Sequence, residues 1–210
     1  MPPYPCPMTI KTLTWAQSGT TINDDSGDAV AGIFYGGIMG LAEDWPENLV
    51  TPTLIVPCGS HKGTDPQPSA DLLAQWSLDS WEPFNAAVEE LVVLASSKDT
   101  QLVILPGAGG RLSDAICTVT WANAHPDIPL LIDPARWLTP SMMTDLNDHL
   151  IRSASLCQEI PNIWGVVVRS VQADDDGHLI HAPIGEGHMT DELLDRTIRT
   201  IPTQRRIECL

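Results

Sequence analysis

Short apolar runs recur along the chain, and longer amphipathic stretches separate them. Such runs are too short and too continuous for surface helices and are typical of strands buried on both faces of a parallel sheet. Strands that alternate with helices predict parallel βαβ units in an α/β protein. The five runs are Thr53–Cys58, Leu102–Pro106, Leu130–Asp133, Gly165–Arg169 and Arg206–Leu210.

The stretches between these runs carry apolar residues at helical spacing. We expect one helix over Ser80–Ser97, a second that opens at Thr139-Pro140, and a third capped by Thr190. The glycine-rich apolar stretch 29–44 predicts a further buried helix. The run Asp174–Gly177 predicts a turn, after which the chain returns as a short extended piece.

The first 28 residues give a weaker pattern than the rest. They contain early prolines, and their only strand-like piece is Thr9–Trp15. We therefore expect an irregular N-terminal segment over 1–28. Residues 29–210 then form a single domain, for which a chain of 210 residues with 43% hydrophobic content is long enough.

Charge and composition exclude several classes of protein. The chain has 11 basic and 27 acidic residues and a net charge of −16. This balance repels phosphate backbones and anionic lipids, so we expect no nucleic-acid partner and no membrane. The start of the chain lacks the pattern of a signal peptide, and five scattered cysteines fit reduced thiols, which together predict a cytoplasmic protein.

Two carboxylates at strand ends are candidate metal ligands. Asp133 closes the run LLID, where it either caps the next turn or belongs to a site, because a carboxylate there is costly to bury without a partner. Glu208 lies within the run RRIECL. It either points into a barrel mouth, as a metal ligand or base, or points to solvent beside Arg206.

A glycine-rich loop follows the run at 102–106. Its backbone N–H groups, together with the charge of Arg111, suit a phosphate or a carboxylate, which makes Gly107, Gly109, Gly110 and Arg111 candidate substrate-binding residues. A tight turn that uses the same glycines is the alternative. The loop matches no established phosphate-binding motif.

Three histidines fall close together at positions 178, 181 and 188. Their spacing fits no zinc pattern, so we do not expect all three to bind one metal ion. A single histidine that lines a site is the better interpretation, and His181 is the candidate proton carrier.

The order of these pieces resembles the xylose-isomerase-like TIM barrels, a superfamily of sugar-phosphate isomerases and epimerases. The resemblance rests on Val166-Val-Val-Arg-Ser, on Ala182-Pro-Ile-Gly-Glu-Gly187 with its capped helix, on Arg206-Ile-Glu208, and on LLIDPARW. It implies a TIM-barrel-like parallel sheet with outer helices. Because the chain is short and its first two strands are hard to find, we expect a barrel that is incomplete or open, with fewer than eight strands.

The resemblance also implies a site. Asp133 and Glu208 would hold a divalent metal ion (Mn²⁺, Co²⁺, Mg²⁺ or Zn²⁺), with Glu208 and His181 catalytic and with Arg169 and Glu186 among the substrate contacts. Other ligands of the family are missing. Pro106 and Gly107 stand where a strand-end glutamate is usual, and Arg136 stands where a histidine is usual.

Two functions follow from these observations. The first is isomerisation or epimerisation of a small sugar or sugar acid through a metal-stabilised enediolate. The second is a catalytically degenerate barrel that binds a sugar-like or anionic ligand, or a partner protein, without turnover. A homo-oligomer that covers open sheet edges accompanies either function. DNA repair in the manner of the related endonucleases is excluded by charge and by the missing ligands.

Overall fold

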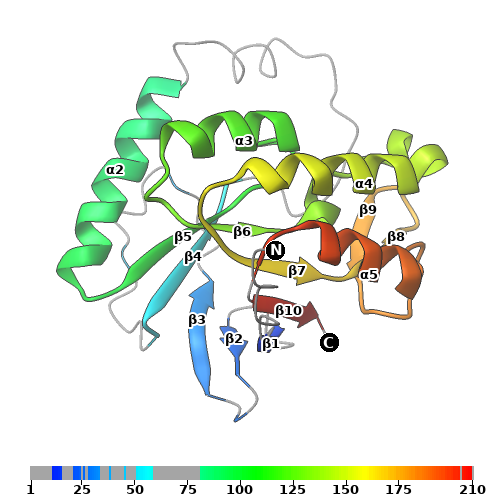
Figure 1. Cartoon of the computed structure of the whole chain (residues 1–210), viewed down its shortest axis with the longest axis horizontal. Coiled ribbons are helices and arrows are strands. Elements are labelled where there is room, and N and C mark those ends of the chain that lie inside the picture. The colour runs from blue at the N-terminus through cyan, green and yellow to red at the C-terminus, as the bar shows by residue number, and fades with distance from the viewer. Residues whose placement is uncertain are drawn as a thin grey trace, which may run out of the picture.

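The computed structural model describes residues 11–15, 21–24, 26, 28–33, 38, 45, 51–58, 81–203 and 205–209. Strands and helices alternate over most of this range (Figure 1). The strands are β1 (Lys11–Trp15), β2 (Thr21–Asn23), β3 (Ala29–Ile33), β4 (Thr53–Pro57), β5 (Gln101–Leu105), β6 (Leu130–Ile132), β7 (Ile163–Val168), β8 (Ser170–Ala173), β9 (Leu179–Ala182) and β10 (Arg205–Cys209). The described α-helices are α2 (Trp81–Ser97), α3 (Ala115–Ala124), α4 (Leu146–Leu156) and α5 (Asp191–Thr200), and the 3-10 helices are η2 (Pro134–Trp137), η3 (Pro140–Asp145) and η4 (Cys157–Glu159).

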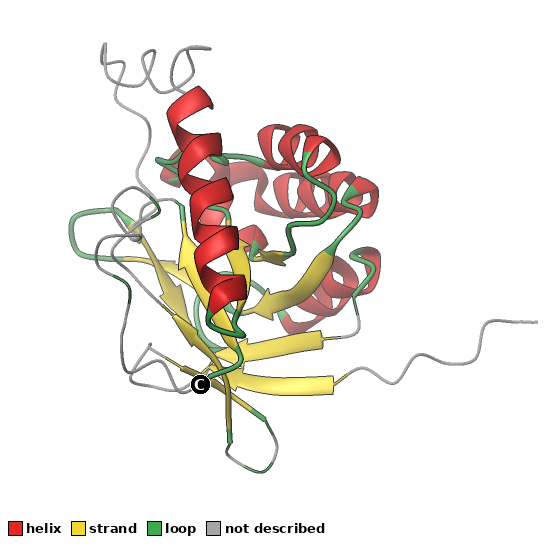
Figure 2. Cartoon of the chain, turned by 90° about the vertical axis from the view of Figure 1, so that its left-hand side faces the viewer, coloured by secondary structure: helices red, strands yellow, loops and turns green. Residues whose placement is uncertain are grey.

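Eight strands form a ring in the order β1-β10-β7-β6-β5-β4-β3-β2. Seven of them run parallel, and β2 is antiparallel to both of its neighbours. Figure 2 shows the described helices gathered in one layer on one side of this ring. This confirms the expected α/β, TIM-barrel-like parallel sheet with outer helices.

The parallel part of the barrel is incomplete, as expected, because it holds seven strands and a full TIM barrel has eight. The antiparallel β2 closes the circuit through two residue pairs with β1. Each strand of the described ring therefore has a neighbour on both sides, so a partner chain is not needed to cover an open edge of these strands.

The N-terminal segment departs from the expectation. The strand-like piece at 9–15 contains β1, but β2 also lies within residues 1–28, so the two described strands of this segment belong to the barrel. The expected helix at 29–44 is wrong at its start, because Ala29–Ile33 is strand β3. Its alternating side chains place Ala31 and Ile33 in the barrel interior, and Ile33 pairs with Ile55 of β4. The rest of that prediction lies outside the described residues.

Two cores are separated by the sheet. Alternate residues of the strands fill the barrel interior, among them Val103, Leu131, Val167 and Ile207. Their chain neighbours on the other face pack against the helices. This alternation decides which strand-end side chains can meet inside the barrel.

The helices largely follow the sequence pattern. Thr190 caps α5 as expected, since its hydroxyl accepts a hydrogen bond from the Leu193 N–H at 3.3 Å. The helix expected from Thr139-Pro140 begins instead as a 3-10 helix, η3, and becomes α-helical only at Leu146. Among the described residues, no helix has the length and apolar content that a membrane span requires.

Candidate functional site

Charged side chains lie inside the barrel at the carboxyl ends of β6 and β7. Asp133 directly follows β6 and is 0% exposed, and Arg169 directly follows β7 and is 7% exposed. The Arg169 guanidinium donates a hydrogen bond to Oδ2 of Asp133 and forms an ion pair with it. The cap alternative for Asp133 is realised, because its Oδ1 caps η2 by accepting a hydrogen bond from the Ala135 N–H at 3.1 Å. Its membership of a site stays a prediction.

A second buried arginine lies at the neighbouring strand end. Arg136, within η2, is 4% exposed, and its Nε donates to the carbonyl of Pro106 at 3.3 Å. Its own carbonyl accepts from the Ala108 N–H at 2.9 Å. The ladder between β5 and β6 contains one residue pair, Ile104 with Leu130. The contacts of Arg136 therefore extend the link between these strands beyond the end of their ladder.

Glycine at position 107 makes room for this arginine. A Cβ atom there would lie 2.7 Å from Nε of Arg136. In the expected anion-binding loop, the N–H of Gly107 donates to the carbonyl of Leu112 at 3.1 Å, and the N–H of Ala108 is used by Arg136. This part of the loop thus corresponds to the tight-turn alternative, in which backbone carbonyls of the chain accept hydrogen bonds from the N–H groups of Gly107 and Ala108.

The remaining loop residues lie further out. Gly109 is exposed and has a positive φ of 77°, which suits glycine in a turn. Gly110 and Arg111 are partly exposed. Their role in substrate binding stays a prediction. Asp114 then caps α3 by accepting a hydrogen bond from the Cys117 N–H at 2.8 Å.

Cys58 follows β4 and borders the same region. Its backbone N–H donates to the carbonyl of Leu105 at 3.0 Å, and its Sγ donates to the same carbonyl at 3.5 Å. Burial raises the pKa of the Cys58 thiol to about 12, and the nearby charge of Arg136 opposes this shift without overcoming it. Burial therefore favours the protonated thiol over the thiolate.

The segment after the β8–β9 hairpin folds back over the end of β7. The N–H of His188 donates to the carbonyl of Val171 at 2.8 Å, and the N–H of Met189 donates to the hydroxyl of Ser170 at 2.9 Å. A Cβ at Gly187 would lie 2.4 Å from the Val171 carbonyl oxygen, and the φ of Gly187 is +77°. Only glycine fits this close approach. Glu186 beside it is exposed, so its role as a substrate contact stays a prediction.

Glu208 and Asp133 lie on opposite faces of the sheet. On β10 the side chain of Ile207 fills the barrel interior, so the alternation of the strand turns Glu208 to the outer face. There its Oε1 lies 3.1 Å from Nε of Arg206, and the two side chains are 35% and 30% exposed. The alternation thus separates the two carboxylates by the sheet, an arrangement that does not favour one divalent metal ion between Asp133 and Glu208. The metal-ligand and catalytic roles of Glu208 stay predictions.

His181 lies on β9, opposite Val171 in the hairpin register, and is partly buried. Its assignment as proton carrier stays a prediction. The two other histidines of the sequence cluster lie elsewhere on the hairpin and the following loop.

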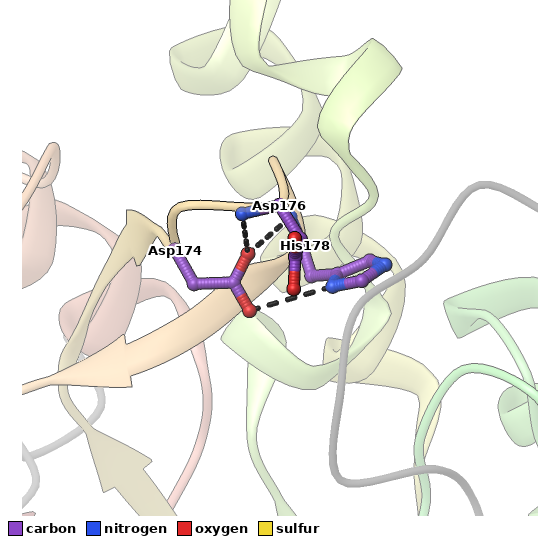
Figure 3. Close-up of side chains that lie close together, drawn as sticks. All are labelled: Asp174, Asp176 and His178. Atoms are coloured by element: carbon purple, nitrogen blue, oxygen red, sulfur yellow. Dashed lines mark hydrogen bonds and ion pairs between the residues drawn. The ribbon is translucent and has the colours of Figure 1, made fainter.

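One group among the described residues has the donor atoms for a metal ion. Asp174, Asp176 and His178, at the turn of the hairpin, each offer a ligand atom within 4.8 Å of the others, and the group is exposed (Figure 3). Oδ1 of Asp174 accepts hydrogen bonds from the backbone N–H groups of Asp176 at 3.0 Å and of His178 at 2.8 Å. The hairpin turn alone accounts for this arrangement, in which an aspartate closes an Asx turn.

No protein-family model, curated protein or solved structure matches this chain. Membership of the xylose-isomerase-like superfamily therefore stays a prediction from the sequence motifs. The barrel architecture is independent of that prediction, because it follows from the strand order.

The sequence motifs found Asp133 and Arg169 but missed Arg136. In the sequence, Arg136 occupies the position at which the resembled family usually has a histidine ligand. In the structure it is buried at the strand ends together with Asp133. The signal was present in the run LLIDPARWL, where an arginine stands among apolar residues. A basic residue in such a run needs a buried partner or a ligand.

Proposed function

We propose that the carboxyl ends of β5, β6 and β7 bind a small sugar acid or sugar phosphate. One observation carries this proposal. A chain with 11 basic residues against 27 acidic ones places two of its arginines, 136 and 169, in buried positions at these strand ends. Ligands of parallel α/β proteins bind at this end of the strands.

The chemistry of these residues suits an anion. Guanidinium groups offer several N–H donors in a planar fork that matches carboxylate and phosphate oxygens. The ion pair with Asp133 fixes the orientation of Arg169, and the carbonyl of Pro106 fixes that of Arg136. Prepositioned donors reduce the entropy that ligand binding costs.

Binding without metal-dependent turnover is the better supported of the two expected functions. The isomerase would require Asp133 and Glu208 at one metal ion, and these carboxylates lie on opposite faces of the sheet. Both oxygens of Asp133 already accept hydrogen bonds from the chain. The residues at these strand ends thus suit recognition of an anion rather than proton transfer through this carboxylate.

A thermal-shift titration tests the proposal. Gluconate, glucuronate and glucose 6-phosphate are added to the protein in the presence of EDTA, with glucose as the neutral control. A ligand at one hundred times its Kd stabilises the folded state by about 2.7 kcal/mol, which raises Tm by several degrees. We expect a rise with at least one of the three anions and none with glucose.

Two variants locate the binding. Arg136→Met is expected to abolish the rise, whereas Arg196→Met, which removes an exposed arginine of α5, leaves it unchanged. An equal loss in Arg111→Gln alone would move the site to the glycine-rich loop. Absence of a rise with all three anions, or an equal rise in Arg136→Met, contradicts the proposal.

A further inference from the structure

A groove of about 790 Å³ lies on the outside of the barrel, between the start of α4 and the β8–β9 hairpin. Pro140 and residues 143–148 form one wall, and Ala173, Gly177 and Leu179 of the hairpin form the other, with His188 beside them. The volume falls in the range of pockets that enclose a drug-sized ligand, roughly 300–1000 Å³. A segment of a few residues fits such a groove, and a whole domain does not.

The groove has an apolar base. Leu146 and Leu179 line it from opposite walls and are only 8% and 3% exposed, and Met143 is half-buried beside them. These side chains belong to the core between sheet and helices or pack against it. An occupant therefore gains from presenting an apolar side chain to this base.

The rim of the groove is acidic. Asp145 and Asp148 line the groove from the helical wall. Three consecutive aspartates, 174–176, lie next to the lining, in the hairpin turn between the lining residues Ala173 and Gly177, and Figure 3 shows Asp174 and Asp176 at this turn. None of the described residues that line the groove is a lysine or an arginine.

The positive charge near the groove is smaller than the negative charge of these aspartates. Arg152 neutralises Asp148 through an ion pair of 2.8 Å. Nδ1 of His178 lies 3.4 Å from Oδ2 of Asp174, and this ring adds positive charge only when it is protonated. The start of α4 contributes roughly half of a positive charge from the helix dipole. Asp145 and the exposed aspartates 175 and 176 leave an excess of negative charge around an apolar base.

We infer that this groove docks a short basic segment of a partner protein, in which lysine or arginine side chains alternate with apolar ones. The apolar side chains contact Met143, Leu146 and Leu179, and the cationic ones reach the acidic rim. This site is separate from the strand ends at Arg136 and Arg169, so either proposal can fail without the other.

The chain carries a charge of −16, so any polycation is attracted to it to some extent. The test separates this general attraction from docking with two labelled hexapeptides of equal charge, one of alternating lysine and leucine and one of alternating lysine and serine. Fluorescence anisotropy at 150 mM NaCl measures the Kd of each. We expect the lysine–leucine peptide to bind more tightly, because only it fills the apolar base.

Two charge variants locate the binding. The triple variant Asp145→Asn/Asp175→Asn/Asp176→Asn removes the rim, and Glu82→Gln/Glu89→Gln/Glu90→Gln removes the same charge from exposed positions of α2, at the opposite side of the molecule in Figure 1. Asp145 occupies the N-cap position of α4 without a side-chain capping hydrogen bond, so its replacement leaves the helix start intact. Thermal melts check that both variants fold.

The rim variant is expected to weaken binding of the lysine–leucine peptide by about tenfold, as three exposed ion pairs allow, and the α2 variant by less than about twofold. Equal weakening in the two variants would show attraction to the whole charge of the chain and would overturn the inference. Equal affinity for the lysine–serine peptide would overturn it as well, because the apolar base would then play no part.

Discussion

Two ion pairs near the carboxyl ends of neighbouring strands differ sharply in their surroundings. Asp133 and Arg169, at the ends of β6 and β7, are nearly inaccessible to solvent inside the barrel. Glu208 and Arg206, on β10, lie on the outer face and are about one third exposed. In the sequence both carboxylates stand beside short apolar runs, and both looked like metal ligands.

The difference in exposure between the two pairs comes from a shift of one residue along the strand. In β10 the interior position is taken by Ile207, whereas the interior position after β6 and after β7 falls on a charged residue. Successive side chains of a strand point to opposite faces, so a shift by one residue moves a carboxylate from the barrel interior to its outer surface. The buried pair is the one on which the proposed ligand site rests.

The largest effect is expected from breaking the buried pair. Asp133→Ala leaves the Arg169 guanidinium buried without its carboxylate, which costs about 3–5 kcal/mol of unfolding free energy. Urea denaturation measures this loss. The double variant Asp133→Ala/Arg169→Met is expected to recover part of it, because it removes the stranded charge. A loss below about 1 kcal/mol in the single variant would show that solvent reaches the pair.

A smaller effect is expected where β7 and β10 pack together. A Cβ at Gly165 would lie 2.7 Å from Cδ1 of Ile207, the residue that turns Glu208 outward. Gly165→Ala therefore overpacks the interior and costs about 1–3 kcal/mol in urea denaturation. Ile207→Val removes the clashing methyl group. The double variant is therefore expected to lose less unfolding free energy than the sum of the losses in the two single variants. If the two losses simply add, the clash between position 165 and Ile207 is not the cause of the destabilisation.

The exposed pair is expected to contribute much less. Glu208→Gln changes the free energy of unfolding by about 0–1 kcal/mol, because the pair is hydrated and screened. Thermal melts with Mn²⁺ or Mg²⁺ sharpen the comparison. The metal-dependent shift of Tm is expected to be the same in the variant and in the unchanged protein. A metal-dependent rise that Glu208→Gln abolishes would contradict the placement of Glu208 on the outer face.

The smallest effect concerns Asp174, a partly buried carboxylate in the β8–β9 hairpin turn. The pKa of Asp174 is lowered, because hydrogen bonds from the His178 backbone and the charge of His178 outweigh the opposing effect of desolvation. A lowered pKa in the folded state stabilises the hairpin above the ordinary aspartate value of about 3.9, and this contribution is lost as the pH falls through the lowered value. The Tm difference between the unchanged protein and Asp174→Asn is therefore expected to shrink as the pH falls from about 5 through the lowered pKa. A difference that is constant over this range would contradict the shift.

Much of the fold follows from local patterns. The runs at 53–58, 102–106 and 165–169 are strands, and Thr190 caps its helix, because periodicity and capping depend on residues close in sequence. The stretch at 29–33 was wrongly predicted as the start of a helix, because a short apolar run does not by itself distinguish a buried helix from a buried strand. Its parallel pairing with β4, over twenty residues away, made it β3.

The candidate site was predictable only in part. The sequence alone determined that Asp133 and Arg169 end strands and that the chain is strongly acidic, because these are properties of single positions and of composition. Only the tertiary structure decided that Arg136 joins them and that Glu208 does not. The face of the sheet to which a side chain points depends on register with strands distant in sequence, and that register is fixed when the barrel interior fills.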